Sequence, residues 1–430
     1  MLIEFNVKNY RSIRDKVTLS LRASSITEFK EDNTFVKGDQ TYLRSAAIYG
    51  PNASGKSNLI KAMGFVRDFV INSARSMQAA DDIPVRPFKL DLETAKAPSY
   101  FEILFLLQET RYRYGFEVDQ KKVKAEWLFA LTSSRESVLF VRNEKGIEVR
   151  NSFKEGRNLE AKTRDNALFL SVVAQFNGEI SNRILKWFKS FNVLSGIEDA
   201  RYEGITLQAF EKSKHREKII EMLRLADFGI DDLSVKEYDL TEDRLPKDMP
   251  PDIKKEVLSK FKDAKTYEVV TSHKMLPGRN RDETTIQFDF ETEESEGTKK
   301  FFHFAGPILV TLANGSVLVI DELDTKLHPN LTRAIVLLFN SKKTNPRNAQ
   351  LVFATHNTML LSTDILRRDQ IWFVEKNKSN VSDLYSLVEY KLPDTDSKVR
   401  KDASFEKEYI HGRYGAVPIL GNLSKLFEEK

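Results

Sequence analysis

The sequence predicts an α/β protein with a mixed N-terminal β layer, a parallel sheet, and an inserted lobe of antiparallel strands and helices. Three patterns support this fold class. A short apolar strand at 46–49 leads through a glycine-rich turn into an amphipathic helix, residues 100–150 alternate with a period of two, and buried strands alternate with helices from about residue 295. Because 430 residues exceed the size at which one core keeps growing, more than one compact lobe is expected.

The individual elements follow from the spacing of apolar residues. Alternation predicts strands at 2–7 and 17–21, and Leu59, Met63, Val66 and Val70 lie on one face of a helix. A period of two from residue 100 to 150 predicts an antiparallel sheet, with strands near 112–118, 127–131 and 138–141. Helical spacing returns at Ile180, Ile184, Trp187 and Phe191, and again at Ile219, Met222 and Leu223.

We expect the chain to divide into three parts. Residues 239–265 are charged and contain three prolines, which indicates a surface excursion with one short helix, and strands follow at 267–271 and 284–290. We therefore expect residues 1–98 and 291–430 to form the two parts of one head, and residues 99–290 to form a lobe that is first β-rich and then helical.

Composition limits the possible chemistry. The chain has 67 lysines and arginines against 63 acidic residues, and this net charge of +4 does not by itself indicate nucleic acid. The absence of cysteine excludes disulfides, thiolate metal sites and a cysteine nucleophile. The apolar runs are far shorter than the ~18 residues of a membrane span, and the N-terminus lacks the apolar stretch of a secretory signal. We expect a soluble, cytoplasmic protein with no membrane partner.

The segment from Gly50 to Ser57 fits G-x-x-x-x-G-K-[ST], the phosphate-binding loop. Its glycines allow backbone N–H groups to surround a β-phosphate, Lys56 reaches the β and γ oxygens, and Ser57 coordinates Mg²⁺. The alternative is a glycine turn that caps a helix. The strand before the loop and the helix after it favour nucleotide binding. The residues expected to contact ATP are Gly50, Asn52, Ala53, Ser54, Gly55, Lys56, Ser57 and Asn58.

Polar residues also end two later apolar strands. Asp321 and Glu322 follow Val317–Ile320, where Asp321 is expected to hold Mg²⁺ and Glu322 to act as general base for the attacking water. His356 follows the next strand and is predicted to touch the γ-phosphate or that water. The alternatives are an ordinary acidic turn and a structural histidine. Three polar strand ends together favour the catalytic interpretation.

Ser295 and Gly297 precede a helix with an apolar face. A serine and a glycine at a helix start can bind an anion through unpaired N–H groups and the helix dipole. Such a loop also caps helices without any ligand, so the motif is weak by itself. Its position 26 residues before Asp321 favours a role in the nucleotide site.

These motifs, in this order, resemble the ABC-type ATPases, specifically the SMC/RecF/OLD branch. Within that branch the chain resembles the RloA and abortive-infection group of bacterial anti-phage ATPases. The resemblance covers both ends of the chain and the nucleotide core, and little of residues 180–280. The matching stretches are Asn6–Ile13, Ser295–Thr298, Val319–Asp324 with His328-Pro329, Thr355–Asn357 and Gly412–Pro418.

The resemblance implies a RecA-like parallel sheet in an ABC-type head, Mg²⁺-dependent ATP hydrolysis, and head-to-tail dimers or higher oligomers. In such a dimer Ser295 and Gly297 would contact the γ-phosphate bound by the partner. Arg11 would approach the nucleotide, and Gln175 would sense Mg²⁺ and water, with Gln108 as a competing candidate. One departure is an acid, Glu296, where the family's Leu-Ser-Gly-Gly signature has its first glycine.

Three functions remain open at this point. The first is an ATP-hydrolysing switch that controls a separate effector, a nuclease or toxin, in anti-phage defence, because only 74 residues follow His356 and Asp394-x-Asp396 lacks a partner glutamate for a nuclease. The second is a RecF-like ATPase that binds DNA in repair, and the third is an ATP-dependent assembly scaffold. A transporter subunit is the least favoured. The basic residues that could contact DNA are Lys254, Lys255, Lys260, Lys262, Lys265, Arg279 and Arg281.

Overall fold

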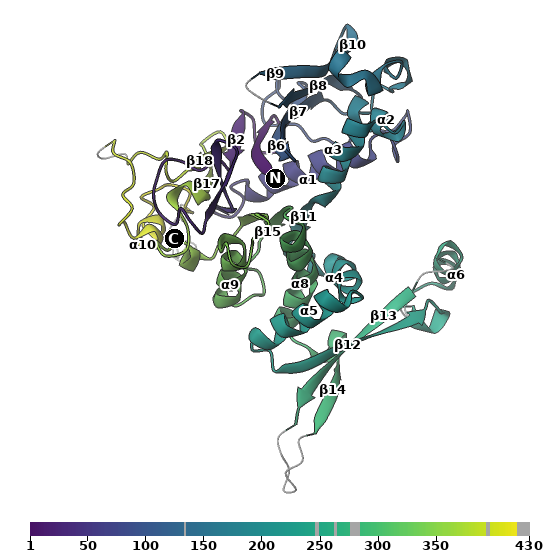
Figure 1. Ribbon diagram of the computed structural model, residues 1–430, viewed down its shortest axis with the longest axis vertical. Coiled ribbons are helices and arrows are strands. Elements are labelled where there is room, and N and C mark those ends of the chain that lie inside the picture. The colour runs from purple at the N-terminus through teal and green to yellow at the C-terminus, as the bar shows by residue number, and fades with distance from the viewer. Residues whose placement is uncertain (133–134, 246–248, 262–264, 276–283, 393–395, 419–430) are drawn as a thin grey trace, which may run out of the picture. The chain divides into compact units, whose positions relative to one another are not determined.

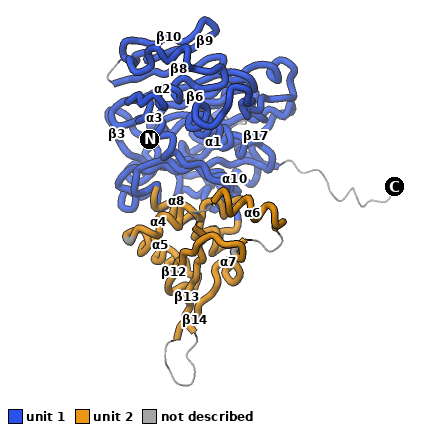
Figure 2. The backbone as a smooth tube through the Cα atoms, turned by 90° about the vertical axis from the view of Figure 1, so that its right-hand side faces the viewer, with its two compact units in different colours: residues 1–197, 311–325, 329–430 blue, residues 198–310, 326–328 orange. Residues whose placement is uncertain are grey.

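The computed structural model describes residues 1–132, 135–245, 249–261, 265–275, 284–392 and 396–418 (Figure 1). The chain forms two compact units, which are coloured separately in Figure 2. Unit 1 contains Met1–Ile197, Thr311–Thr325 and Pro329–Lys430, and unit 2 contains Glu198–Val310 and Lys326–His328. Among the described residues, none of the helices combines the length and apolar character that crossing a membrane requires.

The parallel sheet of unit 1 has the order β11-β15-β16-β5-β17-β18. All neighbours run parallel except β18, which pairs antiparallel with β17. The central strands are apolar and buried throughout, as expected for a sheet covered on both faces. The strands are β5 (Ser45–Tyr49), β11 (Phe191–Ser195), β15 (Val317–Asp321), β16 (Gln350–Ala354), β17 (Ile371–Lys376) and β18 (Ser382–Ser386).

The second sheet of unit 1 is antiparallel, with the order β10-β9-β8-β7-β6-β1-β2. Inward and outward residues alternate along β7, which is the period of two seen in the sequence. Two further strands, β3 (Thr34–Lys37) and β4 (Gln40–Leu43), form a separate pair. The seven strands are β1 (Leu2–Lys8), β2 (Val17–Ser20), β6 (Ser99–Leu107), β7 (Thr110–Val118), β8 (Val123–Leu131), β9 (Glu136–Asn143) and β10 (Gly146–Val149).

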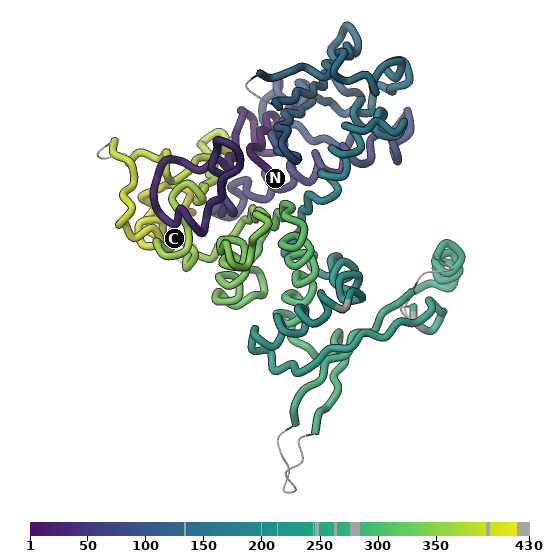
Figure 3. The backbone as a smooth tube through the Cα atoms, viewed as in Figure 1, coloured from purple at the N-terminus to yellow at the C-terminus, as the bar shows by residue number. Residues whose placement is uncertain are grey.

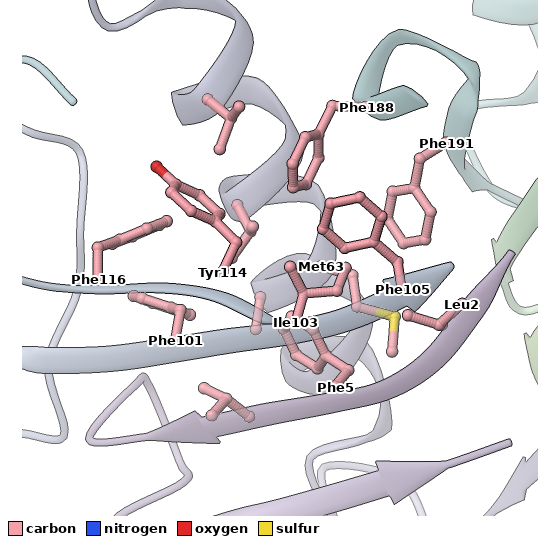
Figure 4. Packing of buried hydrophobic residues seen from close by; sticks show 14 of the residues in the cluster. Leu2, Phe5, Met63, Phe101, Ile103, Phe105, Tyr114, Phe116, Phe188 and Phe191 are labelled. Carbon is pink, nitrogen blue, oxygen red and sulfur yellow. The ribbon is translucent and has the colours of Figure 1, made fainter. Parts of the chain in front are cut away.

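An aromatic core joins α1 (Lys56–Asn72) to the antiparallel sheet (Figure 4). Phe65 of α1 packs against Phe101 with ring centroids 5.0 Å apart, and Phe105 stacks on Trp187 of α3 (Glu179–Ser190) at 4.2 Å. Helix α1 also contacts β15 and β16 of the parallel sheet. The helix that follows the phosphate loop is therefore fixed between the two sheets. The other helices of unit 1 are α2 (Phe169–Gln175), α9 (Pro329–Asn340) and α10 (Phe405–Ile410).

Unit 2 combines helices with a three-stranded antiparallel sheet of order β12-β13-β14. Figure 3 follows β12 and β13 as a long antiparallel pair. Helix α8 (Glu296–Asn314) begins in this unit and leads into β15. The other elements are α4 (Glu203–Phe210), α5 (Ser213–Leu225), β12 (Ile230–Asp239), α6 (Pro251–Lys260), β13 (Lys265–Lys274), β14 (Thr285–Asp289) and α7 (Phe290–Glu293).

The predicted fold class is confirmed, with differences in how the chain is divided. The compact units do not follow the expected boundaries at 98 and 290, because β6 pairs with β1 and thereby joins the antiparallel sheet to unit 1. The inserted unit begins only at Glu198. Phe191, which was expected to lie on a helix, is the first residue of β11. The short helix expected within 239–265 is α6.

Candidate nucleotide-binding site

The phosphate loop connects β5 to α1, as the sequence predicts. Gly55 directly precedes α1 and has a φ of +121°, which side-chain-bearing residues rarely adopt. A Cβ at this position would lie 2.3 Å from Oγ of Ser382. Only glycine therefore lets the loop turn into the helix while packing against β18.

Lys56 is buried at the first residue of α1, and its ammonium group is turned toward the loop itself. Nζ donates to the carbonyl oxygens of Gly50 at 2.7 Å and Pro51 at 3.2 Å. Burial lowers the pKa of Lys56 to about 8, although the carboxylates after β15 oppose that shift. A bound phosphate would replace these carbonyls as the partner of the ammonium group.

Asp321 ends β15 with its carboxylate beside the phosphate loop. Burial raises its pKa, a hydrogen bond from the Ser57 hydroxyl lowers it, and the adjacent Glu322 raises it again. Oδ1 of Asp321 is buried and has no hydrogen-bond partner among the described residues. An unsatisfied carboxylate oxygen next to a serine hydroxyl is the oxygen donor set that Mg²⁺ prefers, so these two residues fit the ion.

Glu322 lies in a left-handed backbone conformation with a φ of +54°, which is uncommon for a glutamate and typical of functional turns. Its Oε2 accepts a hydrogen bond of 3.2 Å from Thr325. The neighbouring strand supports this turn, since Gly196 donates its N–H to the carbonyl of Asp321 at 2.7 Å. A Cβ on Gly196 would lie 2.1 Å from the carbonyl oxygen of Glu322.

His356 follows β16, two residues beyond its last residue, Ala354. Its backbone N–H lies 3.2 Å from both carboxylate oxygens of Asp324. Burial and the positive charge of Lys56 lower the pKa of the imidazole, against the opposing effect of nearby carboxylates. The lowered pKa favours the neutral ring at pH 7, and the ring lies near Lys56 and the acidic pair.

A chain of hydroxyl groups behind the phosphate loop was not predicted. The Asn58 side-chain amide donates to Oγ of Ser12 at 2.7 Å, Oγ of Ser12 lies 2.7 Å from Oγ of Ser382, and Ser382 reaches the carbonyl of Ser54 at 2.5 Å. Because a carbonyl can only accept, the Ser382 proton goes to Ser54, and Ser12 must donate to Ser382. Asn58, expected to contact the nucleotide, therefore supports the loop from behind.

Arg11 lies next to this chain, with its guanidinium on Tyr10. Nε of Arg11 donates to the Tyr10 hydroxyl at 3.2 Å, and the guanidinium carbon is 5.5 Å from that ring's centroid. Its backbone has a φ of +53°, and its N–H donates to the carbonyl of Arg86. The structure thus brings Arg11 near the loop through its neighbour Ser12, with the side chain held by an aromatic ring.

Neither predicted glutamine lies with these residues. Ser171, one turn before Gln175, donates to the carbonyl of Val70, about 21 Å along α1 from Lys56 at 1.5 Å per residue. Gln175 is therefore at the far end of α1, and its expected role as a metal ligand is not supported.

Gln108 is also at the opposite edge. Gln108 directly follows β6. In that strand the N–H of Leu106 donates to the carbonyl of Met1, and the N–H of Leu2, which follows Met1, donates to the side chain of Gln350, at the amino end of β16. His356 lies beyond the carboxyl end of that strand. Instead of a glutamine, Ser195 is the residue of β11 that pairs with Asp321, and Gly196 follows it.

The loop with Ser295 and Gly297 lies in unit 2. Oγ of Ser295 accepts the N–H of Thr298 at 3.1 Å and caps α8. Glu296, the acid at the position of the first signature glycine, pairs with Lys326 at 2.9 Å and Lys299 at 3.2 Å. Its bond to Lys326 is the main cause that lowers its pKa. The extra acid is therefore neutralised within its own unit.

Glu294, just before Ser295, joins the same loop to the three-stranded sheet. Its Oε1 accepts from the hydroxyl of Thr271 and lies 2.7 Å from Nε2 of His273, both on β13. Thr271 is fully buried. The start of the loop is thus tied to β13 by two side-chain contacts.

The phosphate loop, the acidic pair and the histidine occupy the carboxyl ends of adjacent parallel strands, with a separate Ser-x-Gly loop before a helix. This arrangement defines an ABC-type P-loop ATPase. The family model described as "AAA domain, putative AbiEii toxin, Type IV TA system" matches residues 45–362. The chain belongs to this family.

Solved structures and curated proteins complete the comparison. The chain is similar to an SMC head domain from Thermotoga maritima, with 15% identity, a TM-score of 0.41, and 90% of this chain and 98% of that chain covered. It is also similar to a structure of the recombination mediator protein RecF with ATPrS, with 14% identity, a TM-score of 0.35, and coverage of 89% and 98%. No curated protein matches the chain.

Some of the residues suggested for DNA binding or nuclease activity form ion pairs within the chain. Lys260 pairs with Glu256 at 2.6 Å, and Lys265 pairs with Asp239 at 2.7 Å and with Glu237 at 3.4 Å, so these lysines are neutralised locally. Asp396 pairs with Lys391. Four further residues named from the sequence lie outside the described residues: Lys262, Arg279, Arg281 and Asp394.

Proposed function

We propose that this chain hydrolyses ATP with Mg²⁺ and uses the cycle of binding and hydrolysis as a switch. The observation that supports this most is the convergence of Lys56, Ser57, Asp321, Glu322 and His356 at one edge of the parallel sheet. The unsatisfied Oδ1 of Asp321 next to Ser57 gives this edge a place for a cation. A site that only bound nucleotide would not need a general base at Glu322.

In the proposed reaction, each side chain has one task. Lys56 leaves the loop carbonyls and neutralises the β and γ oxygens, and Ser57 with Asp321 would hold Mg²⁺, which supplies positive charge to the phosphates when bound. Glu322 accepts a proton from water as the new P–O bond forms and the bond between the γ phosphorus and the bridging oxygen breaks, which yields ADP and phosphate. The neutral imidazole of His356 orients the water or the γ-phosphate.

We further propose that ATP joins two copies of the chain head to tail. In this arrangement Ser295 and Gly297 of one copy complete the site of the other, and the paired state of Glu296 removes one source of repulsion from the triphosphate. The support comes from the resemblance to ABC-type heads and from the N-capped helix behind Ser295. Opening would follow hydrolysis, because the γ-phosphate would no longer link the two loops.

The test uses Glu322→Gln, which keeps the shape of the side chain and removes its ability to accept the proton. We expect hydrolysis to fall by ~100-fold or more, within the usual contribution of general acid–base catalysis, and ATP-dependent dimers to live longer. Light scattering after size-exclusion chromatography measures the dimers. The control, Lys56→Ala, should bind ATP weakly and stay monomeric. If Glu322→Gln stays monomeric in ATP, the switch is disproved.

The proposed partner is a separate effector, a nuclease or toxin in anti-phage defence. The family description, which names a toxin and a toxin–antitoxin system, supports a role in such a pair. Co-expression with the product of the adjacent gene, followed by pull-down with and without ATP, tests the idea. The idea is refuted if the two proteins do not bind each other either with or without ATP, and if deletion of the ATPase gene leaves phage resistance unchanged. Steeply salt-dependent DNA binding would instead favour the RecF-like alternative.

A further inference from the structure

Two glutamates and a histidine come together in unit 2, apart from the residues of the nucleotide site. Glu203 is the first residue of α4, Glu291 lies in α7, and His303 lies in α8. One ligand atom from each of the three side chains lies within 4.8 Å of the others. The three residues come from different helices, so helical spacing along one element does not produce the cluster.

Close packing of α4 on α8 holds two members of the cluster in place. Thr206 is fully buried, its Oγ1 lies 2.9 Å from the carbonyl of His303, and it accepts the N–H of Gly306 at 3.1 Å. A Cβ on Gly306 would lie 2.4 Å from Cα of Thr206. Glu203 lies three residues before Thr206, and His303 lies three residues before Gly306. Each is therefore about one helical turn from the contact between α4 and α8.

The third member is held by an aromatic anchor. Phe290, adjacent to Glu291, is fully buried, and its ring centroid lies 4.9 Å from that of Phe302 and 6.2 Å from that of His303. Moving Glu291 away from the cluster would withdraw this ring from the core of unit 2. Glu291 itself is exposed, which leaves the cluster open to ions from solvent.

The two carboxylates of the cluster disfavour each other's charge. Burial raises the pKa of Glu203, and the charge of Glu291 raises it further, while His303 opposes the shift. The half-buried carboxylate of Glu203 and the exposed carboxylate of Glu291 repel each other, and a divalent ion would compensate both charges. The nearly buried imidazole adds a nitrogen donor that Mg²⁺ and Ca²⁺ do not prefer.

We propose that Glu203, Glu291 and His303 bind one divalent transition-metal ion, with Zn²⁺ as the natural occupant. One imidazole nitrogen and two carboxylate oxygens, with a fourth position left for water, form a set that zinc accepts. Zinc–ligand distances of ~2.0–2.2 Å bring the donor atoms closer together than the 4.8 Å limit of this cluster, and the exposed Glu291 side chain is free to rotate toward the other two. The bound ion links the first turns of α4 and α7 to α8.

The experiment uses the full chain, freed of metal by a chelator, without nucleotide and with excess Mg²⁺ to occupy oxygen-only sites. Calorimetric titration with ZnCl₂ should give one site. Mutating residues that only support a metal's ligands lowers the affinity ~10- to 100-fold, so Glu291→Gln, which alters a ligand itself, should lower the Zn²⁺ affinity by more. The matched control is Glu293→Gln, an exposed position on the same helix whose remaining amide oxygen can still accept from Asp289. It should bind Zn²⁺ like the unchanged chain.

A second measurement reports on the ligands of the bound ion. Co²⁺ in place of Zn²⁺ should give strong visible absorption from a low-coordinate site with a nitrogen ligand, and Glu291→Gln should weaken it. Equal Zn²⁺ affinity in Glu291→Gln and in the unchanged chain, or displacement of Zn²⁺ by the excess Mg²⁺, overturns the proposal. Loss of ATPase activity in Glu322→Gln has no bearing on this result, so the two proposals fail separately.

Discussion

Replacing Ser382 by alanine tests whether β18 supports the phosphate loop. In the structure the Ser382 hydroxyl joins Ser12 to the carbonyl of Ser54, and it is buried next to Gly55. Alanine removes the proton donated to Ser54 and the acceptor used by Ser12. The carbonyl of Ser54 would then remain buried without this donor.

The size of the effect follows from the cost of an unmade buried hydrogen bond. Leaving a buried donor or acceptor without its partner costs about 1–3 kcal/mol, and the free energy of unfolding should fall by that amount. If this free energy destabilises only the loop conformation that binds phosphate, ATP binds ~5- to 150-fold more weakly, because each 1.4 kcal/mol changes the dissociation constant tenfold. The expected decrease in affinity therefore has an upper bound.

The strand also supplies the matched control. Ser386, at the other end of β18, is equally buried, and its Oγ has no hydrogen-bond partner among the described residues. Ser386→Ala should change stability by less than ~0.5 kcal/mol, because no hydrogen bond is lost. Urea unfolding and fluorescent-ATP titration measure the two quantities. Equal stability losses in both variants, with unchanged ATP affinity in Ser382→Ala, would refute the reasoning.

Three more outcomes follow from the site. ATP affinity should fall as pH rises above about 8, which is the pKa of Lys56 in the free protein, because the neutral amine must take up a proton to bind phosphate. ATP titrations at pH 7.5 to 9.5 measure this decrease. The ATP affinity of the control, Lys56→Ala, should not change over the same pH range. Gly196→Ala should slow hydrolysis more than ATP binding, since its Cβ would lie 2.1 Å from a backbone oxygen of the loop after β15; comparing turnover with ATP affinity checks this. Lys326→Ala should weaken ATP-dependent dimerisation by exposing the charge of Glu296, and adding Glu296→Gln should restore it, as light scattering would show.

Each of these has a result that contradicts it. A constant ATP affinity across that pH range would mean that Lys56 keeps its proton in the free protein. Normal turnover in Gly196→Ala would show that the loop after β15 can shift without loss. Dimerisation that is insensitive to Lys326→Ala would place Glu296 away from the triphosphate.

The sequence was sufficient to predict those elements in which an apolar strand pattern ends in residues with a recognisable chemical role. The phosphate loop, β15 and β16 were predicted because apolar runs end in polar residues that no buried strand needs. β11 was missed because Phe191 continues a helical spacing, while its pairing with β15 depends on residues more than a hundred positions away. No local signal distinguishes such a parallel edge strand from a helix end.

The residues around the site were harder to predict than those within it. Ser382 is an ordinary serine at a strand start, and only folding brings it to Ser12, 370 positions away in the chain. Gln175 was chosen for its residue type, and the packing of α2 on the far end of α1 overrides that choice. The boundary expected at residue 98 was drawn from a change of period, which does not show that β6 pairs with β1.

The chain passes between the two units at four points, after residues 197, 310, 325 and 328. The first directly follows β11, and the other three lie on the segments that enter and leave β15, whose last residue is Asp321. Mechanical load on unit 2 is therefore delivered covalently to two adjoining strands: β15, which ends in Asp321, and β11, which Gly196 follows. If the proposed ATPase function is correct, we expect a protein that pulls on unit 2 to alter the rate of hydrolysis without touching the nucleotide, so that ATP turnover reports tension as well as occupancy.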